Sequence, residues 1–192
     1  MMIENGILAD TANSGSESAA VTSARSLHQS LETALQNKRG DLKDSEEDLL
    51  KDYHTADIFR ALKDKCITKD SGEYTYELCF MKNTSQKSKK GGGKTGMGNF
   101  VRFDKMVVDE EVGSDGKGLG KGERLVLKFE NGQNCWNGPN RETTVVVACA
   151  EEDEIWKVAE MEKCLYRMEV GSPVVCERLG SGAATKEGKD EL

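Results

Sequence analysis

The stretch SQKSKKGGGKTGMG, residues 85–98, has the residue types of a phosphate-binding loop. Its glycines are followed by Lys94 and Thr95, as in the pattern G-x-x-x-x-G-K-[ST] that surrounds nucleotide phosphates. Ser88, however, stands where that pattern requires its first glycine. The following residues, GMGNFVRF, have no helical pattern, so no helix N-terminus would face a phosphate. We therefore exclude a nucleotide site and expect a long, solvated hairpin loop over residues 86–98.

Six cysteines form a second group of residues with their own chemistry. None is in a C-x-x-C arrangement, and His28 and His54 lie outside the cysteine region, so we predict neither a metal site nor a cofactor. In an oxidising compartment the six would form three disulfides, but their spacing leaves 15 pairings open. The cysteines are Cys66, Cys79, Cys135, Cys149, Cys164 and Cys176.

The C-terminal residues Lys189, Asp190, Glu191 and Leu192 spell K-D-E-L. This signal is bound by a receptor that returns lumenal proteins to the endoplasmic reticulum. We therefore predict a protein of the endoplasmic reticulum lumen, with the KDEL receptor as a partner. The first twenty residues lack the basic and apolar regions of a signal peptide, which leads us to expect further sequence upstream of Met1.

The overall composition narrows the classes of partner. The formal net charge is -7, which argues against nucleic acid. No apolar run approaches the roughly 20 residues that span a bilayer, so we expect no membrane insertion. A chain of 192 residues has room for one ordinary domain and an extension.

The N-terminal third of the chain has a helical pattern. We expect residues 1–23 to be disordered and residues 24–63 to be helical; the end of a coiled coil is one interpretation of this segment. Within the second range, Gly40 and Asp41 interrupt the pattern, and DIFRALKDKC, residues 57–66, predicts a second short helix. The pattern rests on a stripe of leucines at intervals of four and seven: Leu27, Leu31, Leu35, Leu42 and Leu49.

From Cys66 onward the pattern is that of β-strands. Short alternating segments separated by Gly/Asn-rich turns indicate an antiparallel sandwich or flattened barrel. Two dividers, residues 86–98 and 113–122, are predicted to be long flexible loops, and residues 179–192 a flexible tail. The predicted strands are GEYTYELCF, NFVRFDKMVV, ERLVLKFE, TTVVVACA and EKCLYRMEV.

Two longer motifs carry a resemblance to a known family. They are GQNCWNGPNRETTVVVACA, residues 132–150, and EMEKCLYRMEVGSPVVC, residues 160–176. Together they resemble the mannose-6-phosphate receptor homology (MRH) domains, and DIFRALKDKC, SQK and CWNGPNR resemble the members in glucosidase II beta subunits. The resemblance implies a mainly β MRH lectin domain over residues 64–178. It also implies three disulfides: Cys66–Cys79, Cys135–Cys164 and Cys149–Cys176.

The resemblance also implies a sugar-binding site. Its residues would be Gln86, Arg141, Glu160 and Tyr166, with Trp136 shaping the site. These residue types suit a hexose, whose hydroxyls both donate and accept: arginine only donates, an ionised glutamate only accepts, and glutamine does both. The tryptophan would cover an apolar ring face or wall the pocket.

Each candidate residue also has a simpler interpretation. Arg141 could be a surface charge, Tyr166 a core aromatic residue and Trp136 a packing residue, while Glu162 is a rival to Glu160 in the same acidic run. Asn83 begins the N-glycosylation sequence Asn83-Thr84-Ser85, and a glycan there would crowd Gln86.

The function that the resemblance implies is that of a non-catalytic lectin module. It would bind α-linked mannose of high-mannose N-glycans and promote glucose trimming by the catalytic alpha subunit of glucosidase II. In the family, the regions of the beta subunit that bind this catalytic subunit lie upstream of the lectin domain. The alternatives are a lectin of endoplasmic-reticulum-associated degradation with the same fold, and a non-lectin interaction module that uses the helical segment. A glycosidase is disfavoured because it would need two carboxylates flanking one pocket, and only Glu160 is convincingly placed.

Overall fold

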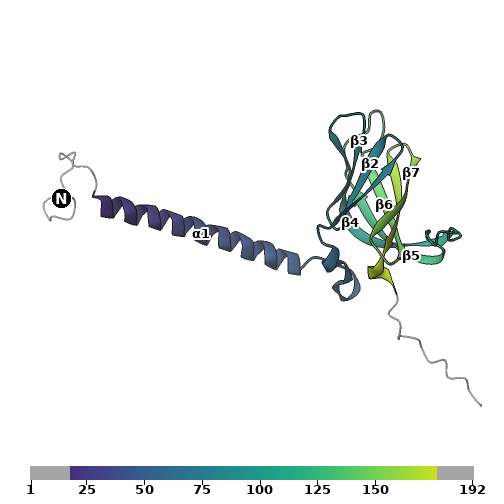
Figure 1. The fold of residues 1–192 in the computed structure, drawn as a ribbon. Coiled ribbons are helices and arrows are strands. Elements are labelled where there is room, and N and C mark those ends of the chain that lie inside the picture. The colour runs from purple at the N-terminus through teal and green to yellow at the C-terminus, as the bar shows by residue number, and fades with distance from the viewer. Residues whose placement is uncertain (1–17, 177–192) are drawn as a thin grey trace, which may run out of the picture. The chain divides into compact units, whose positions relative to one another are not determined.

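A computed structural model describes residues 18–176 (Figure 1). The chain divides into two compact units, Met1–Asp52 and Tyr53–Leu192, and each is described here by itself. The expectations for the first seventeen residues, for the tail and for the K-D-E-L signal fall outside the described residues.

The first unit contains one helix, α1 (Ala19–Leu49). It begins five residues earlier than predicted, because Ser18 caps it: the Ser18 hydroxyl accepts a hydrogen bond from the Val21 amide at 3.4 Å. It also continues unbroken through Gly40, which is exposed and has no atom within 4 Å of the position of a Cβ, so the cost is conformational only. No residue of α1 is buried. Within residues 18–176 no helix is both long and apolar enough to cross a bilayer.

The second unit is an eight-stranded sheet whose order is β1-β2-β3-β4-β5-β6-β8-β7. Its two edge strands, β1 and β7, lie in contact, so the sheet curves into a flattened, nearly closed barrel (Figure 1). All neighbours pair antiparallel except β6 and β8, which are parallel because β7 returns the chain. The strands are β1 (Cys66–Ser71), β2 (Tyr74–Cys79), β3 (Asn83–Ser88), β4 (Lys94–Asp109), β5 (Lys121–Glu130), β6 (Glu142–Cys149), β7 (Glu154–Glu162) and β8 (Leu165–Ser172).

The five predicted strands are confirmed, and three further strands, β1, β3 and β7, were not predicted. The long loop predicted over residues 86–98 is wrong, since only residues 89–93 separate β3 from β4. Thr84 in β3 is buried and hydrogen-bonded to Thr143 at 3.0 Å, so a polar sequence here is an inner strand. Gly98 is needed inside β4, because a Cβ there would lie 2.6 Å from the Phe129 backbone.

A short 3-10 helix, η1 (Thr55–Leu62), replaces the helix predicted for residues 57–66. Its backbone is interrupted by positive φ angles of 56° at Ala56 and Asp57, which prevents a continuous α-helix. Phe59 and Leu62 are buried in the barrel core. The compact β-unit therefore begins at Tyr53, eleven residues before the predicted boundary at residue 64. A second 3-10 turn, η2 (Pro173–Val175), follows β8.

The three implied disulfides are all confirmed. Cys66–Cys79 joins β1 to β2, Cys149–Cys176 joins the end of β6 to the segment after η2, and Cys135–Cys164 joins two loops. Each closes a separation of 13 to 29 residues, which stabilises the fold by about 3 kcal/mol in the loop-entropy account.

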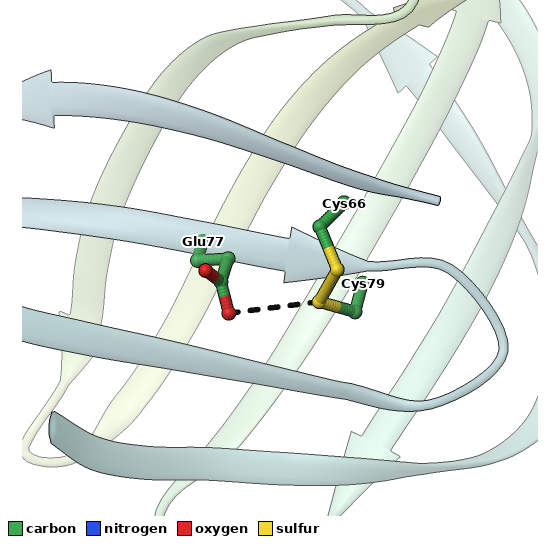
Figure 2. A group of neighbouring side chains, drawn as sticks. All are labelled: Cys66, Glu77 and Cys79. Carbon is green, nitrogen blue, oxygen red and sulfur yellow. Dashed lines mark hydrogen bonds between the residues drawn. A yellow bond between two sulfur atoms is a disulfide. The ribbon is translucent and has the colours of Figure 1, made fainter. Parts of the chain in front are cut away.

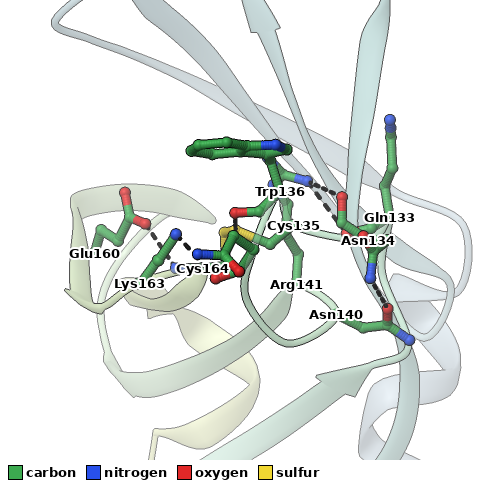
Figure 3. The surroundings of a disulfide bond; sticks show 10 residues. Gln133, Asn134, Cys135, Trp136, Asn140, Arg141, Glu160, Lys163 and Cys164 are labelled. Carbon is green, nitrogen blue, oxygen red and sulfur yellow. Dashed lines mark hydrogen bonds between the residues drawn. A yellow bond between two sulfur atoms is a disulfide. The ribbon is translucent and has the colours of Figure 1, made fainter.

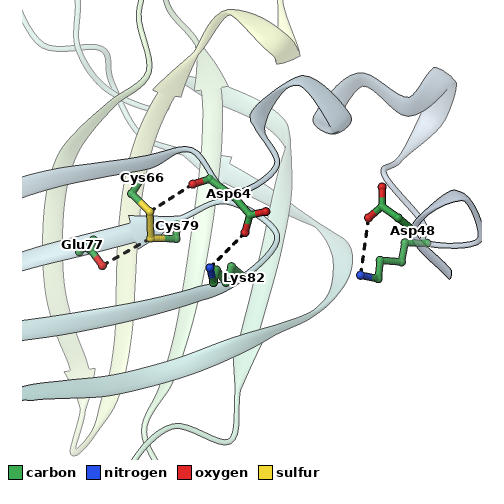
Figure 4. A network of polar contacts seen from close by, with 7 residues as sticks. Asp48, Asp64, Cys66, Glu77, Cys79 and Lys82 are labelled. Atoms are coloured by element: carbon green, nitrogen blue, oxygen red, sulfur yellow. Dashed lines mark hydrogen bonds and ion pairs between the residues drawn. A yellow bond between two sulfur atoms is a disulfide. The ribbon is translucent and has the colours of Figure 1, made fainter. Parts of the chain in front are cut away.

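A carboxylate lies beside the first of these disulfides (Figure 2). An oxygen of Glu77 is 3.5 Å from the Cys79 sulfur. The two sulfurs and this carboxylate lie within 4.8 Å of one another, a spacing that could hold a metal ion. Because both sulfurs are committed to the disulfide, they are not thiolate ligands. Nearby, Lys82 in the turn after β2 and Asp64 before β1 form an exposed ion pair of 3.4 Å (Figure 4).

Candidate functional site

The five predicted site residues line one cavity of about 330 Å³. This volume lies near the lower end of the range of about 300–1,000 Å³ that is usual for small-ligand pockets. The cavity lies between β2, β3, the loop before β6, and the β7–β8 hairpin. Its lining consists of Tyr74, Tyr76, Gln86, Cys135, Trp136, Arg141, Glu160, Lys163, Cys164 and Tyr166.

Gln86 is positioned by the pairing of two neighbouring strands. It lies in β3 opposite Tyr76 of β2, and Tyr74 is two positions further along the same face of β2. Gln86 is 9% exposed, and its side chain forms no hydrogen bond with any residue of the described part of the chain. Its amide oxygen and nitrogen are therefore free to bind one acceptor and one donor of a ligand.

Arg141 is fixed by the loop that precedes β6 (Figure 3). Its Nη1 donates to the carbonyl oxygens of Gln133 at 3.2 Å and Asn134 at 3.0 Å, and backbone hydrogen bonds with Gly132 and Gln133 close the loop. Gly132 allows this closure, because a Cβ there would lie 2.6 Å from the Arg141 carbonyl oxygen. The Arg141 Nε is buried, and no group among residues 18–176 accepts its proton. A buried donor left unpaired costs about 1–3 kcal/mol, and because Nε has almost no accessible surface, a ligand in the cavity does not reach it.

Glu160 and Tyr166 face each other across the β7–β8 hairpin. A register shift between Glu160 and Glu162 and a positive φ of 67° at Cys164 shape the hairpin end. There the Cys164 amide donates to a Glu160 carboxylate oxygen at 2.7 Å, which orients the carboxylate. Glu160 lines the cavity, whereas its rival Glu162 does not.

Two tyrosines of the cavity, Tyr166 and Tyr76, have raised pKa values. Burial raises the pKa of Tyr166, the negative charge of Glu160 acts in the same direction, and Arg141 opposes both. Burial likewise raises the pKa of Tyr76, with smaller contributions from Tyr166, Tyr74 and Glu160. Both phenols therefore remain able to donate a hydrogen bond at neutral pH.

Trp136 is at the rim of the cavity and not in the core, since 87% of it is exposed. The Cys135–Cys164 disulfide ties its loop to the β7–β8 hairpin, which places Trp136 beside Lys163 (Figure 3). The Lys163 Nζ lies 5.5 Å from the centre of the indole ring and donates to the Asn137 carbonyl oxygen at 3.1 Å. The exposed indole face can therefore cover the apolar face of a ligand.

Three lining residues, Tyr74, Tyr76 and Lys163, were not predicted as site residues. In the alternating pattern that predicted β2, both tyrosines lie on the same face as Leu78 and Phe80. That face continues from the core into the cavity, so the alternation could have identified both tyrosines as lining residues. Lys163 had no distinguishing signal beyond its position next to Cys164.

Asn83 lies in a different part of the surface from Gln86. It lines a separate cavity of about 390 Å³ that is also lined by Asn99 and Asn131, and that does not include Gln86. Asn83 and Gln86 lie three positions apart in β3 and line different cavities, and the expectation that a glycan on Asn83 would crowd Gln86 stays a prediction. Whether Asn83 carries a glycan stays a prediction.

The fold and the candidate site define a disulfide-bonded β-domain with a polar pocket whose side chains can both donate and accept hydrogen bonds. A family model described as "Glucosidase II beta subunit-like protein" matches residues 25–189. The chain belongs to this family.

Several relatives show the same likeness. The chain is 37% identical over 124 residues to "Glucosidase 2 subunit beta" of Mycosarcoma maydis, and 34% identical over 134 residues to the human protein of that name. These matches cover 65% and 70% of this chain but only 20% and 23% of the two relatives. A crystal structure of the MRH domain of glucosidase II beta bound to mannose is 35% identical, with a TM-score of 0.44, over 62% of this chain and 99% of that domain.

Proposed function

We propose that the β-unit is a non-catalytic lectin module that binds α-linked mannose of high-mannose N-glycans. The observation that carries the proposal is the convergence of Gln86, Arg141, Glu160 and Tyr166 on one cavity. The family of the chain agrees with it.

Each side chain has a part in the proposed recognition. Arg141 donates and Glu160 accepts, so together they hold two adjacent hydroxyls and disfavour a sugar whose hydroxyls are misplaced. Gln86 and Arg141 converge on the axial 2-hydroxyl, the group that distinguishes mannose from glucose. Because the carboxylate and the indole are exposed, solvent competes for them, and the affinity of a single site is weak.

The lining of the cavity is that of a binding site and not of a glycosidase. Glycoside hydrolysis uses two carboxyl groups that flank the scissile bond. Glu160 is the one acidic residue among the described residues that line this cavity. We therefore assign no hydrolytic role to this module.

We propose that the module serves a catalytic partner by binding the glycans of that partner's substrates. It holds glycoproteins near the catalytic alpha subunit of glucosidase II and raises their effective concentration there, which promotes glucose trimming. The K-D-E-L residues at the C-terminus support residence in the lumen of the endoplasmic reticulum through the KDEL receptor. The alpha subunit, the receptor and the location are all parts of the proposal.

A glycan array with the wild-type chain and three variants tests the proposal. Arg141→Ala and Glu160→Ala should lose retention on mannose-terminated glycans while circular dichroism shows an unchanged fold. The matched control is Glu162→Ala, which removes a neighbouring carboxylate outside the cavity and should retain binding. Equal retention by all four proteins would sink the assignment.

A further inference from the structure

Helix α1 carries an apolar stripe that nothing described in its own unit covers. The helix is 31 residues long and has no buried residue. Its leucines Leu31, Leu35, Leu42 and Leu49 are between 52% and 73% exposed. An exposed apolar stripe along several helical turns marks a surface that packs against another helix.

The stripe follows the seven-residue repeat of a two-stranded coiled coil, whose core positions are called a and d. The a positions are Val21, His28, Leu35, Leu42 and Leu49, and the d positions are Ala24, Leu31, Lys38 and Ser45. Gly40 then falls on the outer face, where its missing side chain costs no contact. The residue that most weakens the repeat is Lys38, a charge in the middle of the stripe.

The charges beside the stripe indicate what covers it. The e positions carry Arg25, Glu32, Arg39 and Glu46, which alternate in sign. In an antiparallel pair of identical helices, e positions face e positions. With Leu42 packed on Leu31 of the second copy, Arg25 lies opposite the other Glu46 and Glu32 opposite the other Arg39. The two-fold symmetry gives four such opposite-charge contacts.

A parallel pair of the same helices has no such match. Lys38 would face the Lys38 of the second copy inside the core, and Asp41 at position g would face the second Glu46. Like charges at both places oppose the parallel arrangement. In the antiparallel arrangement Lys38 instead packs beside Leu35 of the second copy, and its charge reaches solvent along its apolar stem.

We propose that α1 is a self-association surface: two copies of this chain pair through antiparallel α1 helices. The pairing is reversible, because only the Leu31–Leu42 layers are fully apolar and large. A dimer of this kind would present two β-units on one assembly, and therefore two candidate sugar sites to one multiply glycosylated partner. The pairing itself does not depend on the sugar-binding proposal.

Sedimentation equilibrium of the whole chain tests the pairing through a charge swap. The double variant Arg25→Glu/Arg39→Glu makes every e position acidic, and Glu32→Arg/Glu46→Arg makes every e position basic. Each alone should dimerise about tenfold more weakly than wild type, or worse, whereas an equimolar mixture should recover wild-type affinity as a heterodimer. Circular dichroism checks that both variants keep their helix content.

The control is Asp44→Arg/Glu47→Arg, which changes the net charge as much as the second variant but at outer positions of the helix. It should dimerise as wild type does. A wild-type chain that stays monomeric at high micromolar concentration would overturn the proposal. So would stronger dimerisation of Glu32→Arg/Glu46→Arg, because that variant relieves the repulsion between Asp41 and Glu46 that exists only in a parallel pair.

Discussion

The Cys135–Cys164 disulfide should matter to the site far more than its effect on stability explains. It ties the loop that carries Trp136 and Arg141 to the hairpin that carries Glu160. Replacing both cysteines with alanine opens a separation of 29 residues, which costs about 3.6 kcal/mol in the loop-entropy account. We expect the variant to fold less stably and to lose measurable binding of methyl α-mannoside even at temperatures where it remains folded.

The Cys149–Cys176 disulfide is a matched control for this experiment. Its separation of 27 residues gives nearly the same cost, about 3.5 kcal/mol. Cys149, however, lies at the far end of β6, eight residues from Arg141, which is roughly 25 Å of extended strand, and Cys176 is bonded to it there. Cys149→Ala/Cys176→Ala should therefore lose as much stability and retain its affinity for the sugar.

Two measurements separate the effects on stability and on binding. Urea denaturation gives the free energy of unfolding, and isothermal titration calorimetry at 10 °C gives the affinity of the folded protein. Equal losses of affinity in both variants would refute the reasoning, because the site would then depend on stability alone. Retained affinity in Cys135→Ala/Cys164→Ala would show that the loop holds its position without the bridge.

Three further predictions test other parts of the molecule. Arg141→Lys keeps the charge but removes the planar guanidinium that lines the cavity and donates to the Gln133 and Asn134 carbonyls, and calorimetry should show mannoside binding weakened by about 2 kcal/mol, or roughly 30-fold. Arg124→Lys loses similar contacts to loop carbonyls elsewhere and should leave binding unchanged. Because the pKa of Tyr166 is raised, the folded state binds the phenol proton more tightly than the unfolded state does. This contribution to stability is complete below the unfolded pKa near 10 and is lost as pH rises through the higher folded pKa. A melting temperature that rises from pH 9 to pH 11 would contradict this. Phe59→Ala should destabilise the β-unit by about 3–5 kcal/mol because Phe59 is fully buried. Leu49 is exposed, so Leu49→Ala should change the midpoint of urea denaturation little. An unchanged midpoint for Phe59→Ala would place η1 outside the unit.

Sequence patterns predicted the parts of the fold whose residues alternate strongly. TTVVVACA and ERLVLKFE are strands because their apolar residues fill the core, and the structure confirms both. β3 was missed because Thr84, Ser85 and Gln86 are polar, and their burial depends on hydrogen bonds and strands that are distant in the sequence. The early start of α1 could have been predicted from Ser18 followed by two alanines, which are a good cap and good helix formers.

The candidate site shows the same division. The motifs around Trp136, Arg141, Glu160 and Tyr166 placed those residues in the sequence, but strand register and one disulfide bring them together. Tyr76 could not be predicted as a neighbour of Gln86, because only the β2–β3 register sets them opposite each other. The unpaired Arg141 Nε has no counterpart in any local pattern, since it arises from how the loop before β6 closes.

The most direct test of the central claim compares two sugars on the wild-type chain. Calorimetric titration with methyl α-mannoside and with methyl α-glucoside asks whether the pocket formed by Gln86, Arg141, Glu160 and Tyr166 recognises an axial 2-hydroxyl. The account predicts saturable binding of the mannoside and at least about tenfold weaker binding of the glucoside, since one lost hydrogen bond to a charged group costs about 1.5–3 kcal/mol. Equal affinity for the two sugars, or no binding of either, would contradict it.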